Sequence, residues 1–506
     1  MSMDAEVKKK LPGLFLLSFS TFVVCVPAAF TQIISFDLML DLNSFPSDDY
    51  SWAFPLFVAG ECSSMGLCAA CLDRCGRRLP YLIGSVIFIA STVVCATATD
   101  MATFNGARFV QGFGAGIIIV TCIAQIYYDV RDKEGRYIAN GIMSLGFGLG
   151  MLFGIFTSKA ALEFMGWPVA FWAMAILQAL VMYPALNVLK NGERSEMKVD
   201  IPGAVILMIW AAVFILLLQK MYLDWDIRSI EFMMGVAFLV MMAVLFVTVE
   251  ILNPSSMFHR KVDNKRLMLI SMVFIIILGV IDMGAVGFMA KIAFFTYQMT
   301  VAEAAPFFIV MVLGAATTAI TISKTIKRTG HMPWLILSAV LSPIALLSML
   351  QVKEDDPTFM LAVHLFILGL AIGCLVSMLN GTIQNRAGKD NNGALMSFAI
   401  MMRTVSLWLG YNFYQYMVDS YMDVKMGDFI QHWNSILPLE LPSNSTIANL
   451  LITPLGDAIR LLPGLTDEIA TVFAEGVANG FIYGAVIFAV IGIPVSLLLY
   501  GREKTL

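Results

Sequence analysis

Five ionisable side chains interrupt stretches of this sequence that are otherwise apolar. Charged groups inside a membrane-length helix cost about 2.5–3.5 kcal/mol each on insertion scales, so they are candidates for function. A carboxylate in such a place can carry a proton, and a cationic group can pair with that carboxylate or attract an anion. The candidates for proton-coupling chemistry are Glu61, Arg108, Asp282, His364 and Arg403.

Each of the five has an alternative role within the fold. Glu61 either couples transport to protons or forms a buried bridge with Arg108. Asp282 lies in an apolar helix, where it is a candidate proton carrier or a hydrogen-bonding partner of a facing helix. His364 is either a proton relay or a hydrogen-bonded buried imidazole. Arg403 either pairs with Asp282 or another carboxylate, or receives an anionic substrate.

A second group of charges fills the short loop at 72–78, which holds Asp73, Arg74, Gly76, Arg77 and Arg78. A carboxylate at a tight turn can accept hydrogen bonds from the N-terminus of a neighbouring helix and pair with Arg77 or Arg78. Arginines alone would indicate only the orientation of the chain in a membrane. The added Asp73 and Gly76 favour a structural latch, and we use that name for these five residues.

Uncharged polar residues and glycines inside the apolar stretches indicate two further features. Three glycines at four-residue intervals share one helix face, which favours close contact with another helix. The packing glycines are Gly146, Gly150 and Gly154, and the polar candidates for a substrate pocket are Gln32, Gln111, Gln125 and Asn380.

The composition excludes a soluble protein. Of 506 residues, 59% are apolar and only 13% are charged, and the net charge is −4. These values leave too few polar residues to cover soluble domains, and the charge is of the wrong sign for a nucleic-acid partner. We find no catalytic triad, no nucleotide-binding loop and no metal constellation, since Cys68, Cys71 and Cys75 have no matching second cluster. We therefore expect neither an enzyme nor a cofactor.

The apolar stretches predict an all-α integral membrane protein with 14 transmembrane helices, each about 20 residues or longer. Most Lys and Arg residues then fall in alternate loops, which places both termini in the cytoplasm. Residues 418–476 are predicted to be an external loop with short surface helices. The spans are 12–36, 52–72, 79–98, 103–127, 137–159, 167–189, 201–221, 230–252, 267–290, 303–323, 333–350, 358–380, 391–417 and 477–500.

A weak internal repeat divides these spans. Arg74 and Gly76 recur as Arg328 and Gly330, 254 residues further along the chain. The same offset lays span 1 on span 9 and span 4 on span 12. The predicted organisation is an N-terminal six-helix bundle at 1–190, two linker helices at 191–262 and a C-terminal six-helix bundle at 263–506. Paired bundles with a site between them are a transporter architecture.

Several motifs resemble those of the major facilitator superfamily. The latch resembles the superfamily's loop signature between spans 2 and 3, and Arg108 with Gln111 and Gly112 is similar to its Arg-x-x-Gln-Gly motif. The glycines of span 5 resemble its antiporter motif, although Met151 stands where a proline is usual, and span 1 lacks the usual aspartate. With 14 spans, the resemblance points to the drug:proton antiporter branch. It implies that the latch holds the bundles together in the outward-facing state and that Arg108 tunes a nearby carboxylate.

Taken together, these observations predict a proton-coupled secondary transporter that exports a small organic molecule by alternating access. The alternative is a proton-coupled transporter, for uptake or export, of an organic anion such as a siderophore-like metabolite. We expect a monomer in the lipid bilayer of a bacterial inner membrane, with protons and a small molecule as its only other partners and the proton gradient as its energy source.

Overall fold

The computed structural model describes residues 5–42, 48–189, 200–223, 228–254, 256, 265–297, 299, 301–351, 358–387, 391–436 and 463–503. These residues are almost entirely helical and contain no strand. Thirteen helices among them are long and apolar enough to cross a membrane, and the shorter apolar helix Met332–Ser348 brings the number to the predicted fourteen.

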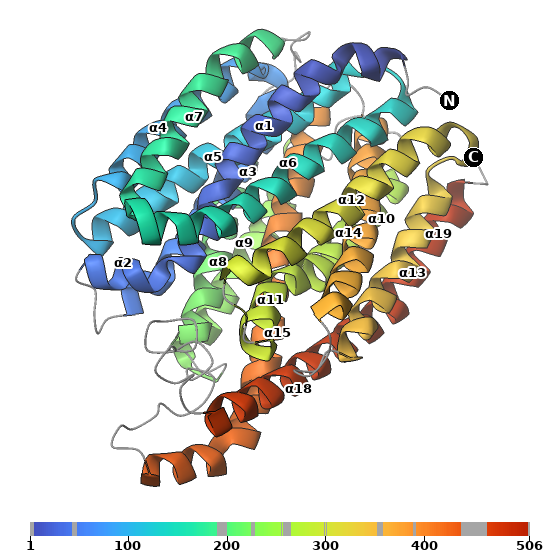
Figure 1. The fold of residues 1–506 in the computed structure, drawn as a ribbon. Helices are drawn as coiled ribbons and strands as arrows, with labels where there is room; N and C mark the ends of the chain where they lie inside the picture. Colours follow the sequence, from blue (N-terminus) through green and yellow to red (C-terminus); the bar gives the residue numbers. More distant parts are fainter. Residues whose placement is uncertain are drawn as a thin grey trace.

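The N-terminal part of the chain forms one group of long helices, drawn in blue and teal in Figure 1. Local chemistry sets several of their ends. The Asp100 carboxylate accepts a hydrogen bond of 2.8 Å from the backbone N–H of Thr103, and Asp132 accepts one of 3.1 Å from Gly135. The helices are α1 (Ala5–Ile33), α2 (Ser35–Asp41), α3 (Ala53–Cys75), α4 (Arg78–Ala96), α5 (Met101–Asp129), α6 (Lys133–Ala160) and α7 (Trp167–Val188).

The C-terminal helices form a second group, and the two linker helices α8 (Ile201–Leu223) and α9 (Ile230–Leu252) precede it. The helix α8 packs against α3 and α9. The first described helix starts, and the last one ends, at the same end of the molecule (Figure 1). The C-terminal elements are α10 (Lys265–Leu278), η4 (Gly279–Met283), α11 (Gly284–Lys291), η5 (Ile292–Thr296), α12 (Val301–Thr329), α13 (Met332–Ser348), α14 (Thr358–Ala387), α15 (Asn392–Ile436), α18 (Pro463–Ile487), η8 (Phe488–Gly492) and α19 (Ile493–Glu503).

Two helix pairs repeat the same close contact. In the first, Gly60 of α3 lies against the backbone oxygen of Phe109 in α5, and in the second Gly314 of α12 lies against that of Phe366 in α14. The two glycines are separated by the offset of 254 residues that the loop motif predicts. A Cβ at either glycine would overlap the opposite backbone, so both pairs require a residue without a side chain there. The bounds of the three predicted domains stay a prediction.

The three glycines of α6 pack against α1, as their spacing predicts. A Cβ at Gly146, Gly150 or Gly154 would overlap the backbone oxygen of Ser18, Phe22 or Val26, respectively. The contact partners also advance by four residues, so two helix faces meet along about three turns.

The structure corrects the predicted ends of three spans. The span at 267–290 is interrupted by η4, a π-helical turn, and followed by a second one, η5. The helix α15 continues to Ile436 and α18 begins at Pro463, so residues 418–436 and 463–476 are helical. The predicted loop at 418–476 therefore starts too early and ends too late, and the span predicted at 477–500 starts too late. The hydroxyl of Tyr421 donates a hydrogen bond of 2.6 Å to Glu475 of α18, and this packing accounts for the extension. The amphipathic segment expected at 447–462 lies outside the described residues.

Candidate functional site

A cavity of about 210 Å³ lies between the N-terminal and C-terminal helices. Its walls come from α1, α3 and α6 on one side and from α11, α12, α14 and α15 on the other. Most of its lining is apolar or aromatic, which suits a small organic molecule. The aromatic and polar side chains of its lining are Gln32, Phe54, Ser144, Phe147, Phe308, Arg403, Trp408 and Tyr411.

Arg403 is the one charged side chain among the lining residues that the structure describes. It is 6% exposed, and its guanidinium carbon lies 5.8 Å from the centre of the Phe147 ring. In the described part of the chain it makes neither a hydrogen bond nor an ion pair. A buried cation with so little compensation is costly unless a ligand or a nearby carboxylate offsets it.

Trp408 follows Arg403 by five residues on α15. The centre of its ring lies 5.5 Å from the centre of the Tyr411 ring, on which it stacks. It also lies 5.5 Å from the centre of the Phe54 ring of α3. The side chain is 3% exposed, and its indole N–H has no acceptor among the described residues. The sequence does not single out this residue, because an indole in an apolar span has no pattern that distinguishes a binding residue from a packing one.

Glu61 interacts electrostatically with Arg403 and forms no ion pair with Arg108. It is buried on α3, and Arg403 is the cation that acts on it electrostatically. The bridge between Glu61 and Arg108 that the sequence left open is absent. Arg403 forms no ion pair with Asp282 or with Glu61 in the described chain, so both alternatives for it, pairing with a carboxylate and receiving an anionic substrate, stay predictions.

Arg108 is held by uncharged groups. It donates hydrogen bonds to the backbone oxygens of Ala53 and Pro27, at 3.1 and 3.2 Å, and to the side chain of Gln111. Its guanidinium also lies 4.4 Å from the centre of the Phe57 ring. No carboxylate of the described residues pairs with it, so the contacts of Arg108 are those of a residue that ties α5 to α1 and α3.

Asp282 lies behind the cavity wall in the π-helical turn η4. It is fully buried and accepts one hydrogen bond of 2.7 Å from the hydroxyl of Ser342 in α13. Its other carboxyl oxygen has no partner among the described residues. Its neighbour Met283 lines the cavity, but Asp282 does not. It therefore pairs neither with Arg403 nor with another cation of the described chain.

His364 is buried on α14, outside the lining of the cavity. In the repeated helix contact, Phe366 of α14 takes the place of Phe109 of α5. His364 therefore lies next to the position that corresponds to Arg108.

Of the predicted pocket residues, Gln32 lines the cavity and the other three do not. Gln111 donates a hydrogen bond of 2.7 Å to Thr92, and Gln125 donates one of 3.2 Å to Asp129. Asn380 is buried on α14. A polar residue in a span does not reveal from sequence alone whether it faces the cavity or a neighbouring helix.

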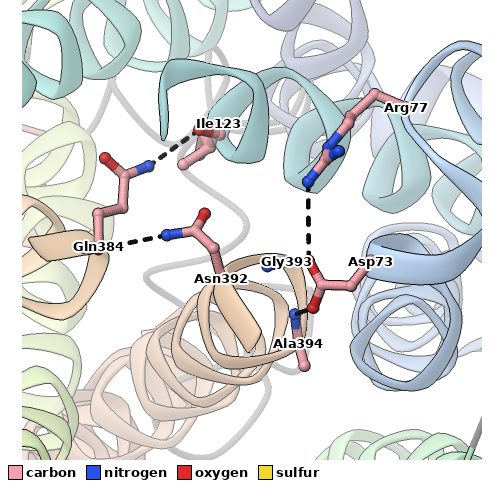
Figure 2. Close-up of polar contacts among 7 residues, drawn as sticks. All are labelled: Asp73, Arg77, Ile123, Gln384, Asn392, Gly393 and Ala394. Atoms are coloured by element: carbon pink, nitrogen blue, oxygen red, sulfur yellow. Dashed lines mark hydrogen bonds and ion pairs between the residues drawn. The ribbon is translucent and has the colours of Figure 1, made fainter. Parts of the chain in front are cut away.

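The latch joins α3 to the N-terminus of α15, as Figure 2 shows. The Asp73 carboxylate accepts hydrogen bonds from the backbone N–H groups of Gly393 and Ala394, at 2.7 and 2.9 Å. Arg77 lies 3.7 Å from the same carboxylate and stacks over the Tyr128 ring at 3.5 Å. The helix N-terminus carries a partial positive charge, so it attracts this carboxylate.

The remaining latch residues have different positions. Gly76 has a φ of 78°, a left-handed conformation that favours glycine, and Gly330 repeats it with a φ of 71°. Arg74 and Arg78 are exposed. They therefore fit the expected role of topogenic charges, whereas Asp73, Gly76 and Arg77 form the buried contact.

Further polar contacts close the same end of the molecule between the two helix groups. Asn140 of α6 donates a hydrogen bond of 2.8 Å to Gln384 of α14. Figure 2 shows that Gln384 in turn donates one of 3.0 Å to the backbone oxygen of Ile123. Arg136 donates one of 3.1 Å to Asn385. These residues were missed, because polar groups at span ends are also typical of ordinary loops.

No group of side chains suited to a metal ion occurs among the described residues, and none of the eight cysteines forms a disulfide.

The known proteins to which this chain is similar are transporters or proteins described as conferring drug resistance. A family model described as Major Facilitator Superfamily matches residues 12–411. An uncharacterised MFS-type transporter of Mycobacterium tuberculosis is 23% identical over 89% of this chain and 64% of its own length, so the chain spans less than two thirds of that relative. The multidrug resistance protein MdtL of Escherichia coli is 32% identical over 28% of this chain and 35% of its own length. The solved human organic anion transporter MFSD10 has a TM-score of 0.57 at 14% identity, covering 95% of this chain and 99% of that one, a likeness of fold.

Proposed function

Because the chain belongs to the Major Facilitator Superfamily, whose members are transporters and not enzymes, we propose that it exports a small organic molecule and takes the energy from protons moving inward. The observation that carries this proposal is the cavity of about 210 Å³ between two groups of helices that are joined at one end by the latch. A site between two rocking halves is what alternating access requires.

The latch sets which end of the cavity is closed. When Asp73 binds the N-terminus of α15, the two helix groups are held together at the end where α3 ends. Breaking these charge-assisted hydrogen bonds allows that end to open. The state described by the structure is thus the one closed at the latch, which we propose to be the outward-facing state.

Glu61 is the residue we propose for proton coupling. It is a buried carboxyl whose charge acts on Arg403, and Arg403 lines the cavity. Protonation of Glu61 therefore changes the electrostatic potential at the place where we propose that a substrate binds. Asp282 and His364 lack this connection to the cavity. We propose a structural role for Arg108, because all its described partners are uncharged.

A second candidate function is the proton-coupled transport of an organic anion, for uptake or export. The buried cation in the cavity wall favours it, and the human structure of similar fold is described as an organic anion transporter. The relative described as a multidrug resistance protein supports export of drug-like molecules instead.

We propose that this multi-pass protein works as a monomer in a bacterial inner membrane, with both termini in the cytoplasm. The bacterial relatives and the distribution of Lys and Arg residues support this placement. Its proposed partners are the lipid bilayer, protons and one small molecule, with no nucleic acid and no cofactor besides the proton gradient.

Transport into liposomes with an imposed proton gradient tests the function. Gradient-driven movement of lipophilic cations against their own gradient supports export of drug-like molecules. Gradient-dependent movement of organic anions supports the second candidate. If no member of a chemically diverse panel moves in response to the gradient, both proposals are wrong.

A further inference from the structure

Two hydrogen-bond donors of α15 line a cavity whose wall is otherwise largely apolar. The guanidinium of Arg403 makes no hydrogen bond or ion pair in the described chain, and the indole N–H of Trp408 has no acceptor there. Both side chains line the cavity from α15 and are more than nine-tenths buried. Buried donors without acceptors cost free energy, and a ligand that supplies acceptor oxygens removes that cost.

The ligand chemistry follows from this arrangement. An acceptor that also carries negative charge satisfies both Arg403 and Trp408, as a carboxylate does with a planar guanidinium. Around them, Phe54, Phe147 and Tyr411 offer aromatic faces, and the rest of the wall is largely aliphatic. The site fits an amphiphilic organic anion with one acidic group and an apolar or aromatic body.

Glu61 links this anion site to the proton. Among the described residues, the other titratable groups that interact with the pair are the thiols of Cys25 on α1 and Cys62 on α3, which are neutral in their usual protonated form. An ionised Glu61 attracts the guanidinium and repels an incoming anion, whereas a protonated Glu61 does neither. Anion binding and protonation therefore favour each other, and the coupling is reciprocal.

We infer that Glu61 and Arg403 form a switch in which a proton on the first and an amphiphilic organic anion on the second bind together. This inference rests on the second candidate function, the proton-coupled transport of an organic anion, because it names the substrate class of the same cavity. It favours movement of the anion in the same direction as the proton over exchange of an exported molecule for protons. Two ligands that stabilise the same loaded state cross the membrane together, so the anion moves with the proton, whereas exchange requires that they compete.

Binding of three matched probes to the purified protein in lipid nanodiscs tests the inference. The probes are 2-naphthylacetate, its neutral methyl ester and 2-(2-naphthyl)ethylammonium, which share one aromatic body and differ in charge. We expect only the carboxylate to bind appreciably, and to bind more tightly as the pH falls from about 8 to about 5.5, a range in which the probe stays ionised.

Variants assign this behaviour to the two residues. Arg403→Gln should weaken carboxylate binding about tenfold or more, as expected for the loss of a charge-assisted hydrogen bond. Trp408→Phe should weaken it several-fold. Glu61→Gln, which mimics the protonated carboxyl, should bind the carboxylate tightly at every pH. The matched controls Arg228→Gln and Glu231→Gln, on the exposed surface next to and within α9, should behave like the wild type.

Three results would overturn the inference: equal binding of the ester and the carboxylate, wild-type binding that does not change with pH, or pH dependence that survives in Glu61→Gln. Thermal unfolding of each variant shows whether the protein is folded. If the carboxylate binds cooperatively with protons but no solute moves in the liposome assay, the proposed function is wrong and the inference stands.

Discussion

At the scale of single residues, the placement of charge inside an apolar protein decides which groups can act on a substrate. Arg403 lines the cavity, whereas Arg108 is occupied by backbone oxygens and Gln111. Both arginines are recognisable from the sequence as costly buried cations. Which of them Glu61 would face could not be predicted, because the rotation of α3 about its own axis is set by packing against α5, α8 and α15.

The first prediction concerns Asp282. In Asp282→Asn we expect the pH dependence of transport to survive, because this carboxyl is fully buried behind the cavity wall and faces no described cation. Transport measured in liposomes across a range of pH checks this. Should the pH dependence vanish while the variant remains folded, Asp282 is the proton carrier and Glu61 is not.

The second prediction concerns Asp73. In Asp73→Asn the amide keeps one acceptor oxygen but loses the charge that binds the N-terminus of α15, so the latch weakens by about 1–2 kcal/mol. We expect slower transport, by up to about tenfold, by a protein that remains folded. The control is Asp100→Asn, which changes an exposed carboxylate that caps the N-terminus of α5 and has no part in the latch. Wild-type turnover in Asp73→Asn would reject the gating role.

At the scale of elements, small residues determine how closely the helices approach. The spans were predictable, because about 20 consecutive apolar residues have few alternatives to a membrane helix. The π-helical turns η4 and η5 were not, since a turn with one extra residue leaves no mark in an apolar sequence. Beyond residue 417, α15 packs against α18, which is distant in the sequence. The polar residues at 418–436 therefore predict a loop when they are read alone.

The third prediction belongs to the contact between α1 and α6. Gly150→Val places side-chain atoms where the backbone oxygen of Phe22 lies, so we expect a destabilisation of about 1–3 kcal/mol or more. Gly148→Ala is the matched control, because its Cβ would come no nearer than 3.9 Å to Val312. Thermal unfolding in detergent compares the two. Equal unfolding temperatures would show that the close packing of α1 on α6 contributes nothing to stability.

At the scale of the whole molecule, two helix groups with repeated internal contacts enclose one cavity and meet at the latch. The repeat was visible in the sequence only as two loops 254 residues apart, and the structure adds the matching helix contacts of Gly60 and Gly314. The cavity itself was not predictable, because its lining mixes residues of seven helices that are distant in the chain. Of the polar residues that line it, the sequence indicates only Gln32 and Arg403.

The central claim is that a solute crosses through this cavity in company with, or in exchange for, a proton. The most direct test is proton movement across liposomes when a transported solute is added, measured with a pH-sensitive dye trapped inside. Gly148→Trp fills the cavity from α6, whereas Gly106→Trp adds the same side chain at an exposed position with open space around it. We expect the first variant, folded by its thermal unfolding, to abolish solute-dependent proton movement and the second to retain it. Solute-dependent proton movement that persists in Gly148→Trp at the wild-type rate would contradict the account.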